Sequence, residues 1–291
     1  MAALSLLVSA VALPRAYAYP LLTGLGGRDG FGVHMLHLND DESSTEIDLS
    51  DAFPNGLRFF GGVFRSFYVN NNGNVSFGGP VRTFTPEAFP IAGQRIIAPF
   101  WSDVDTRPGG DMAVTWQLAT GRVVVTWHDV GYYNHHRDRR NDFQLILRDR
   151  SDVARGAFDA EFRYNRCEWT TGDASGGQNG RGGTPAQAGF DAGDREHFAM
   201  VPGSRTDAIE GICHTSNVGT PGRWVFEIRD GRVSICGNEH VEEPDETCDD
   251  GNRRDGDGCS SRCGLEPGGA QRLPAWALPH TNTPRSAPTG P

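Results

Sequence analysis

The chain has 291 residues, with 37 acidic side chains against 27 arginine or lysine side chains, and a net charge of −10. This acidity argues against nucleic acid or an anionic membrane surface as the main partner. The 38 glycines and 18 prolines favour many short strands joined by turns, and the length allows one domain of about 200 residues with a smaller part beside it.

Residues 1–18 have the pattern of a signal peptide. Ala3–Leu13 is an apolar run of suitable length, and Ala16-Tyr17-Ala18 fits an A-x-A cleavage site. The run is too short to span a bilayer, so we predict secretion without membrane insertion. Residues 19–30, after the cleavage site, are rich in glycine, and we expect them to be loosely held.

Apolar residues that alternate with polar ones predict an all-β domain, an antiparallel β-sandwich-like fold, over residues 31–229. The pattern starts at Phe31, and we expect Val33, Met35 and Leu36 to face the core. No longer stretch has the apolar spacing of a helix, so strands should form nearly all of the regular structure.

Two hairpins are predicted in this domain. In Phe64–Phe77, the central Asn72-Gly73 supplies the positive φ angles that a tight turn needs. Ala113–Leu118 and Arg122–Trp127 flank a second turn with alternating side chains. Further strands are predicted at Phe53–Phe60, Phe143–Leu147, Phe158–Tyr164 and Arg223–Ile228.

Five tryptophans lie in or beside these stretches. Together they could form an aromatic platform for sugar rings, but their positions in apolar registers favour burial. We therefore predict a core that contains Trp101, Trp116, Trp127, Trp169 and Trp224.

Asp103 and Asp105 follow an apolar run at a spacing of two residues. On a strand, both carboxylates would project from one face. They could cap the turn that follows, bind Ca²⁺, or act as acid and base in glycoside hydrolysis. We favour the capping role, because two carboxylates on one strand do not flank a scissile bond from both sides.

Glu168–Gly193 is a glycine-rich stretch between two strand patterns. Its non-repeating order predicts an ordered loop within one domain instead of a linker. No helix pattern follows it, so we do not expect a phosphate cradle. Upstream, His135-His136 has no third ligand at a zinc spacing, and we expect both histidines on a solvated loop.

From about Phe31 to Arg229 the chain resembles the nidogen-like domain. The segments that carry the resemblance are, in order, FPNGLRFFG, YVNNNGNVSFG, FTPEAFPIAG, IIAPFWSDVD, VTWHDVGYYNHHRDRRNDFQLIL, FDAEFRYNRCEWTTGDASGG and GTPGRWVFEIR. The resemblance implies an extracellular β-rich module of the kind found in matrix, mucin-like and adhesive surface proteins. The family has no established catalytic residues, so the resemblance implies no enzyme.

The composition changes after residue 229. We expect a linker at residues 230–235, a small disulfide-rich, loop-dominated module at 236–264, and a disordered tail at 265–291. The segment CGNEHVEEPDETCDDGNRRDGDGCSSRC resembles a short acidic repeat of secreted myxobacterial proteins. A module this small cannot bury enough apolar surface to fold unaided, so disulfides should staple it.

All six cysteines are predicted to form disulfides, as suits an exported chain. The repeat contains four that can pair in three ways, and the sequence does not choose among them: Cys236, Cys248, Cys259 and Cys263. If the repeat closes on itself, Cys167 and Cys213 are left to pair with each other. Zinc is the rival interpretation, but no C-x-x-C pair occurs.

Acidic side chains crowd the turn glycines of the repeat, which raises the free energy of folding unless a cation screens them. Oxygen side chains interleaved with glycine suit a Ca²⁺ loop, although their spacing is not that of an EF-hand. Solvated Asx-turns are the alternative. The predicted ligands are Asp249, Asp250, Asn252, Asp255 and Asp257, and we expect no cofactor other than Ca²⁺.

These features together predict a secreted, non-catalytic protein of the cell-adhesion or cell-matrix type, which attaches to an extracellular protein or glycan. One alternative is a carbohydrate-active β-sandwich enzyme that uses Asp103 and Asp105, and another is a structural spacer in a surface assembly. The chain contains no lysine. Because arginine codons are GC-rich, this absence indicates a high-GC bacterium, with the protein outside the cell or on its surface.

Overall fold

The computed structural model describes residues 19–234, 236, 241, 246–250, 254–261 and 263–267. The chain divides into two compact units, Met1–Ile235 and Cys236–Pro291. The predicted signal peptide at residues 1–18 and most of the predicted tail, residues 268–291, lie outside the described residues. Within the described part of the chain, no helix is long and apolar enough to cross a membrane.

The first unit contains an eight-stranded sheet in which every pairing is antiparallel. Seven strands lie in the order β1-β9-β10-β11-β12-β15-β16, and β8 pairs with β10 off this path. The strands are β1 (His34–Met35), β8 (Val104–Asp105), β9 (Ala113–Ala119), β10 (Arg122–Tyr132), β11 (Asn141–Asp149), β12 (Phe158–Cys167), β15 (Arg223–Arg229) and β16 (Arg232–Ser234).

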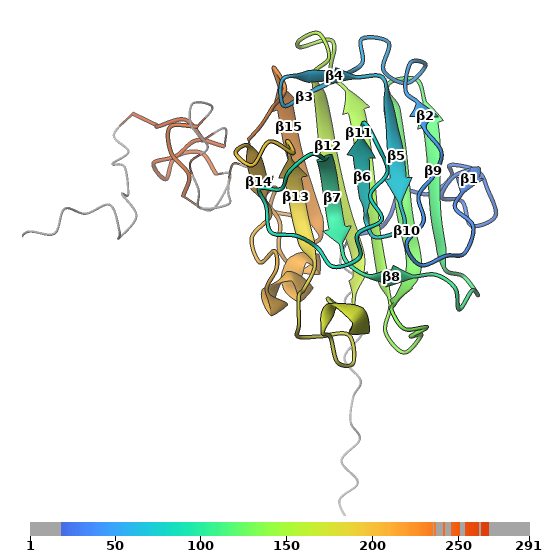
Figure 1. Cartoon of the computed structure of the whole chain (residues 1–291). Coiled ribbons are helices and arrows are strands. Elements are labelled where there is room, and N and C mark those ends of the chain that lie inside the picture. Colours follow the sequence, from blue (N-terminus) through green and yellow to red (C-terminus); the bar gives the residue numbers. More distant parts are fainter. Residues whose placement is uncertain are drawn as a thin grey trace, which may run out of the picture. The chain divides into compact units, whose positions relative to one another are not determined.

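A six-stranded antiparallel sheet lies against the first, in the order β14-β13-β7-β6-β5-β2 (Figure 1). Its strands are β2 (Ile47–Asp48), β5 (Ser66–Asn70), β6 (Asn74–Phe77), β7 (Arg95–Trp101), β13 (Gln187–Asp191) and β14 (Phe198–Met200). A separate ribbon pairs β3 (Leu57–Phe59) with β4 (Gly62–Phe64), and two 3-10 helices are η1 (Asp173–Ser175) and η2 (Asp207–Cys213). The predicted all-β, antiparallel sandwich is confirmed.

The main core fills the space between the two sheets, and its residues follow the period of two that the sequence predicts. On β12, Phe158, Phe162 and Tyr164 are fully buried, while Asp159 and Arg163 between them are only half-buried. Aromatic rings join the layers, since the Phe162 ring on β12 stacks on that of Phe190 on β13, with their centroids 5.3 Å apart. Each buried aromatic side chain stabilises the fold by about 1.5–3 kcal/mol.

All five predicted core tryptophans are buried, with at most 9% of the surface of each exposed. Four belong to the main core, but Trp101 packs with Phe89, Ile91 and Ile96 in a second, smaller cluster. Ile96 and Ile97 are neighbours on β7 and therefore point to opposite faces of the sheet, and Ile97 belongs to the main core. The smaller sheet is therefore covered on both faces.

The expected register after Phe31 is wrong for two of its three residues. Val33 and Met35 are 60% and 58% exposed, whereas Leu36 is buried. Strand β1 is only two residues long, so period-two alternation does not extend over the segment that follows Phe31. His34 on this strand stacks on Trp116 of β9, with ring centroids 5.6 Å apart.

Residues 19–30 are not loosely held throughout, contrary to expectation. The Tyr19 N–H donates to the Tyr164 carbonyl at 2.9 Å, and the Leu22 N–H donates to Gln144 Oε1 at 2.9 Å. The Tyr19 ring also lies 5.0 Å from the guanidinium of Arg163. The segment therefore runs across the outer face of β11 and β12.

The glycine-rich stretch Glu168–Gly193 is ordered and lies within one domain, as predicted; it contains η1 and ends with β13 of the smaller sheet. Its backbone closes on itself, because the Thr170 N–H donates to the Gly180 carbonyl at 2.7 Å and the Thr184 N–H to the Ser175 carbonyl at 2.9 Å. Gly183 has a φ of +59°, and a Cβ there would collide with the Ser175 carbonyl. Only glycine fits where these two segments of the loop approach each other so closely.

A disulfide between Cys167 and Cys213 ties the end of β12 to the end of η2, with a Cα–Cα distance of 6.1 Å. These are the two cysteines that the sequence leaves for each other if the repeat closes on itself. The interval expected to be a linker, residues 230–235, instead contains β16, which pairs with β15. Val233 of that strand is buried, so the first unit extends to residue 235.

The second unit is stapled by Cys236–Cys263 and Cys248–Cys259, so one disulfide loop encloses the other. This is one of the three connectivities that the sequence allows. The Thr247 N–H donates to the Cys263 carbonyl at 2.8 Å, and Cys259 forms an isolated β-bridge with Leu265. In the described part of this unit the disulfides and short turns take the place of a large apolar core.

Candidate functional site

Three acidic side chains converge from two links that each run from one sheet to the other. Asp40 and Asp41 lie between β1 and β2, and Asp103 lies between β7 and β8. Each contributes a carboxylate oxygen, and these three oxygens all lie within 4.8 Å of one another. We call Asp40, Asp41 and Asp103 the acidic cluster.

The asparagine-rich turn between β5 and β6 holds the two links together. Asn72 Nδ2 donates to Asp41 Oδ1 at 2.9 Å, while Asn72 Oδ1 accepts the Val104 N–H at 3.0 Å. Asn71 Nδ2 donates to the backbone carbonyls of Asp40 and Val104. Both asparagines are 1% exposed, so these hydrogen bonds form in a water-poor environment and are costly to break.

A second contact fixes the start of the first link. The Asn39 N–H donates to Thr106 Oγ1, and the Thr106 N–H donates to the Asn39 carbonyl, both at 2.9 Å. Asn39 Oδ1 then accepts the Glu42 N–H at 2.8 Å, which closes a turn around Asp40 and Asp41. One long-range and one local contact within the protein therefore position the turn that carries both carboxylates.

The acidic cluster has too few positive partners. Asp103 is 1% exposed, and its Oδ2 and the Oδ1 of Asp40 are both buried without a hydrogen-bond partner. Burial, together with the neighbouring carboxylates of Asp40 and Asp41, raises the pKa of Asp103 to about 8. Burial and the neighbouring Asp105 and Asp41 raise the pKa of Asp40 to about 6. Three negative charges are therefore poorly tolerated here unless a cation joins them.

Asp105 belongs to a different arrangement. Burial opposes its ionisation, but hydrogen bonds from Arg107 and from the His135 N–H hold the pKa of its carboxyl below the usual value. Arg107 Nε and Nη2 lie 2.9 Å and 2.6 Å from the two carboxylate oxygens, and Nη2 also lies 3.2 Å from Asp40 Oδ2. Arg107 therefore neutralises Asp105 first and reaches only one oxygen of the acidic cluster.

The predicted placement of Asp103 and Asp105 on one strand is wrong, because Asp103 precedes β8 and Asp105 ends it. Asp105 does cap the turn that follows, since its Oδ1 accepts the Arg107 N–H at 3.0 Å. Asp103 makes no such bond. Both side chains are at most 1% exposed, so the arrangement does not place them on opposite walls of an open cleft.

A groove of about 460 Å³ lies beside the Cys167–Cys213 disulfide. We call it the disulfide groove. It is lined by residues of both charges from the 138–139 loop, the end of β12, the glycine-rich loop and η2: Asp138, Arg139, Asn165, Arg166, Cys167, Glu168, Arg181, Glu210, Cys213 and His214. Arg181 pairs with Glu210 across it. Such a surface can hydrogen-bond a polar partner through guanidinium donors and carboxylate acceptors.

His135 and His136 lie in a half-exposed loop after β10, as expected. His136 stacks on Tyr132, with ring centroids 4.3 Å apart, and its Nε2 lies 2.9 Å from Asp173 Oδ2. In the described part of the chain, neither histidine belongs to a group of three residues that could hold a metal ion. Asp173 is thus the residue of the glycine-rich loop whose side chain pairs with His136.

Sequence reasoning missed Asp40 and Asp41 as candidate ligands. The signal present in the sequence is a run of oxygen side chains, Asn39–Glu42, opposite a second run, Asn70–Asn72. Nothing in the local pattern says that the two runs meet, because their contact depends on the pairing of β5 with β6 and on the links between the sheets.

The predicted Ca²⁺ ligands in the repeat are only partly described, because Asn252 lies outside the described residues. Asp255 Oδ1 accepts the Ser261 N–H at 2.7 Å, six residues further along the chain, so this bond is not an Asx turn. The described members Asp249, Asp250, Asp255 and Asp257 do not form a group of three that could share an ion. Calcium binding by the repeat stays a prediction.

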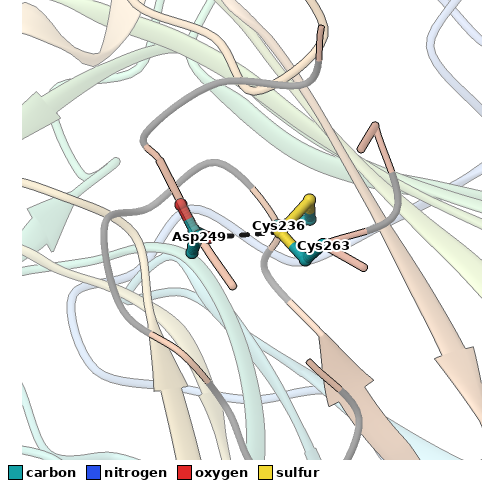
Figure 2. A group of neighbouring side chains, drawn as sticks. All are labelled: Cys236, Asp249 and Cys263. Atoms are coloured by element: carbon teal, nitrogen blue, oxygen red, sulfur yellow. Dashed lines mark hydrogen bonds between the residues drawn. A yellow bond between two sulfur atoms is a disulfide. The ribbon is translucent and has the colours of Figure 1, made fainter. Parts of the chain in front are cut away.

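Figure 2 shows a second group of potential ligands, Cys236, Asp249 and Cys263. Asp249 Oδ2 lies 3.5 Å from Cys263 Sγ. The two sulfurs are joined in a disulfide, so neither is a thiolate and neither can serve as a zinc ligand in this state. The rival zinc interpretation of the repeat therefore finds no support in this group.

Comparisons with known proteins point to one domain family. The model of the family "Nidogen-like domain" matches residues 65–123 and 114–230, which together cover more than half of the chain. Mouse alpha-tectorin is 40% identical over 221 residues, a match that covers 66% of this chain and 10% of alpha-tectorin. Drosophila melanogaster nidogen is 27% identical over 244 residues, or 73% of this chain and 17% of that protein.

The Caenorhabditis elegans dendrite extension defective protein 1 is also similar, at 28% identity over 68% of this chain and 18% of its own length. The chain thus spans a tenth to a fifth of the relatives named here. No solved structure is significantly similar to it. From the family match and the two-sheet fold we conclude that the chain belongs to the nidogen-like domain family.

Proposed function

We propose that this protein is a non-catalytic, extracellular attachment module of the matrix or cell-adhesion type. The observation that carries the proposal is the match of residues 65–230 to the nidogen-like family. We take this family to consist of extracellular matrix and adhesive modules. Three disulfides support the same location, because such bonds persist in oxidising compartments outside the cytosol.

The surface that we propose for attachment is the disulfide groove. It is concave and polar, and loops from several elements build it, which is where β-sandwich domains commonly place recognition residues. The Cys167–Cys213 bond restrains two of its walls, so less conformational entropy is lost when a partner binds. The partner class is a polar extracellular glycan or protein.

The second unit is proposed as an exported, disulfide-stapled appendage. Its acidic repeat resembles the repeat of secreted myxobacterial proteins, and with the absence of lysine this supports a high-GC bacterial source. Residues 1–18 support export through a cleaved signal peptide. N-terminal sequencing of secreted protein that begins at Tyr19 would support this part of the proposal.

A pull-down tests the attachment. Mature protein is incubated with envelopes and with secreted polysaccharide of the source cells, with and without Ca²⁺. We expect retention on one of the two, and we expect Arg181→Ala to reduce it because Arg181 lines the groove. Arg82→Ala, an exposed arginine outside the groove, is the control. If the protein is retained on neither material, or if both variants lose retention equally, the result would argue against the groove as the attachment surface.

A further inference from the structure

In the described part of the chain, the acidic cluster contains a buried carboxylate oxygen that has no hydrogen-bond partner. Asp103 is 1% exposed, and its Oδ2 accepts no hydrogen bond. The carboxylates of Asp40 and Asp41 lie beside it, and Asp40 Oδ1 is buried and unpartnered as well. Like charges this close, away from water, disfavour the folded state unless something positive or a proton lies between them.

Among the described residues, no arginine or histidine forms an ion pair with Asp103. Arg107 pairs with both oxygens of Asp105 and reaches only Oδ2 of Asp40. Tyr133 contributes only its backbone N–H, which donates to the Asp103 carbonyl and not to its carboxylate. Two buried oxygens of the cluster, Asp103 Oδ2 and Asp40 Oδ1, therefore have no hydrogen-bond partner among the described residues.

The surroundings hold the three carboxylates in place instead of letting them separate. Asn72 fixes the Asp41 carboxylate, and Asn71 fixes the backbone of Asp40. Gly172 packs against Asp103, and a Cβ at that glycine would lie 2.5 Å from Asp103 Oδ2. Such a second layer of support is typical of ligands that are oriented toward a metal ion.

We propose that Asp40, Asp41 and Asp103 bind a single Ca²⁺ ion. The donors are all carboxylate oxygens, which hard cations prefer. Calcium–oxygen distances are about 2.3–2.6 Å, so oxygens on opposite sides of one ion lie up to about 5 Å apart. The observed limit of 4.8 Å among the three oxygens fits a shared ion. Water completes the six to eight ligands that Ca²⁺ takes.

The ion would be structural. It would connect the β1–β2 link to the β7–β8 link, next to the β5–β6 turn, and so join the two sheets at a place where the chain otherwise accumulates negative charge. This inference stands apart from the proposed attachment function, because the acidic cluster shares no residue with the disulfide groove.

The test uses the full mature chain, freed of metal with a chelator and titrated with CaCl₂ by calorimetry and by thermal unfolding. We expect saturable uptake in the millimolar range or tighter, as in extracellular calcium modules, and a rise in Tm of at least about 3 °C at saturation. Magnesium at the same concentration should produce a smaller rise, because Mg²⁺ demands near-ideal octahedral geometry with shorter metal–oxygen distances and gives up its water reluctantly.

Two variants locate the ion. Asp41→Asn and Asp103→Asn should each weaken calcium uptake at this site at least about tenfold and remove most of the rise in Tm. Asp191→Asn is the matched control, because Asp191 is also fully buried and burial raises its pKa, yet it lies outside the acidic cluster. The control should keep the calcium response of the unmodified chain.

The comparison also separates this site from any uptake by the repeat, which the three variants leave intact. If Asp41→Asn and Asp103→Asn respond to Ca²⁺ like the unmodified chain, the site is overturned. The site is also overturned by a second result, in which Ca²⁺ does not shift the unfolding transition of the first unit in the unmodified chain and Asp103→Asn raises Tm without metal. That result would mean that a shared proton neutralises the cluster. Half-exposed Asp41 keeps the test valid if the Asp103 variant does not fold.

Discussion

Glu161 on β12 faces away from the core and is nevertheless only 1% exposed. Arginines surround it: Arg148 Nη1 and Arg163 Nε lie 2.7 Å from its oxygens, and Arg223 Nε lies at 3.0 Å. Burial alone would raise the pKa of this carboxyl, but the three guanidinium groups hold it below its usual value. The acid therefore links three neighbouring strands of the larger sheet.

Replacing Glu161 by glutamine removes the charge that the three arginines share. We expect the free energy of unfolding at pH 7 to fall by about 1–2 kcal/mol, a value reduced because the arginines are partly exposed. The folded pKa lies below the usual 4.5, so the charge contributes stability above about pH 4.5 and loses it as the pH falls through the folded pKa.

Urea unfolding of both proteins between pH 3 and pH 7 checks this prediction. The difference between them should be full at pH 7 and should shrink below about pH 4. Glu227→Gln, on β15 with a half-exposed side chain, is the control and should change stability by no more than about 0.5 kcal/mol. A difference between the Glu161 pair that stays constant with pH would contradict the ion-pair account.

Gly73 illustrates a second residue-scale requirement. It has a φ of +77°, and a Cβ would collide with the Phe100 carbonyl. Gly78 has a φ of +89° but open space around its Cβ position. We expect Gly73→Ala to cost about 3 kcal/mol or more and Gly78→Ala about 1 kcal/mol, since only the first adds a clash to the backbone strain.

Chemical unfolding of the two alanine variants separates the two effects, because both share the left-handed backbone and differ in the clash. An equal loss of stability in both variants would show that the close approach to Phe100 is relieved without cost. The Asn72-Gly73 pair predicted this turn from the sequence, but the contact with β7 depends on the assembled sheet and was not predictable.

At the scale of elements, the disulfide groove depends on the bond from β12 to η2. Cys167 ends a strand, Cys213 ends a 3-10 helix, and the glycine-rich loop lies between them in the sequence. Cross-linking these elements removes conformations from the unfolded chain and restrains η2, which belongs to neither sheet.

The double variant Cys167→Ser/Cys213→Ser should therefore lower the stability of the first unit by about 2–4 kcal/mol. Calorimetry should show a lower Tm for the main transition, and limited proteolysis should cut faster within Glu168–Gly193. The paired variant Cys248→Ser/Cys259→Ser, in the other unit, should leave the main transition unchanged. A main transition that falls equally in both variants would contradict the separation of the units.

The elements also show which parts of the fold the sequence could reveal. Local patterns predicted β9, β10, β11, β12 and β15, because each is long enough for period-two alternation to be read. They failed at β1, where two residues carry no period, and at β16, which is held by pairing with β15. Short strands that exist through tertiary contacts leave little local signal.

At the scale of the whole molecule, the same distinction holds for function. The order of motifs indicated a nidogen-like domain, and the family match confirms it. Only one member of the acidic cluster, Asp103, was a candidate ligand from the sequence, because Asp40 and Asp41 lie in a separate loop. The disulfide groove could not be predicted from the sequence, because its lining residues come from four separate segments of the chain.

At this scale we expect the molecule to bind a partner outside the cell. Saturable binding of labelled mature protein to envelopes or secreted polysaccharide of the source cells, measured by co-sedimentation, tests this most directly. We expect a saturable curve that Arg181→Ala weakens at least about tenfold, while Arg82→Ala leaves it unchanged. Linear, non-saturable retention that neither variant changes would contradict a dedicated attachment module.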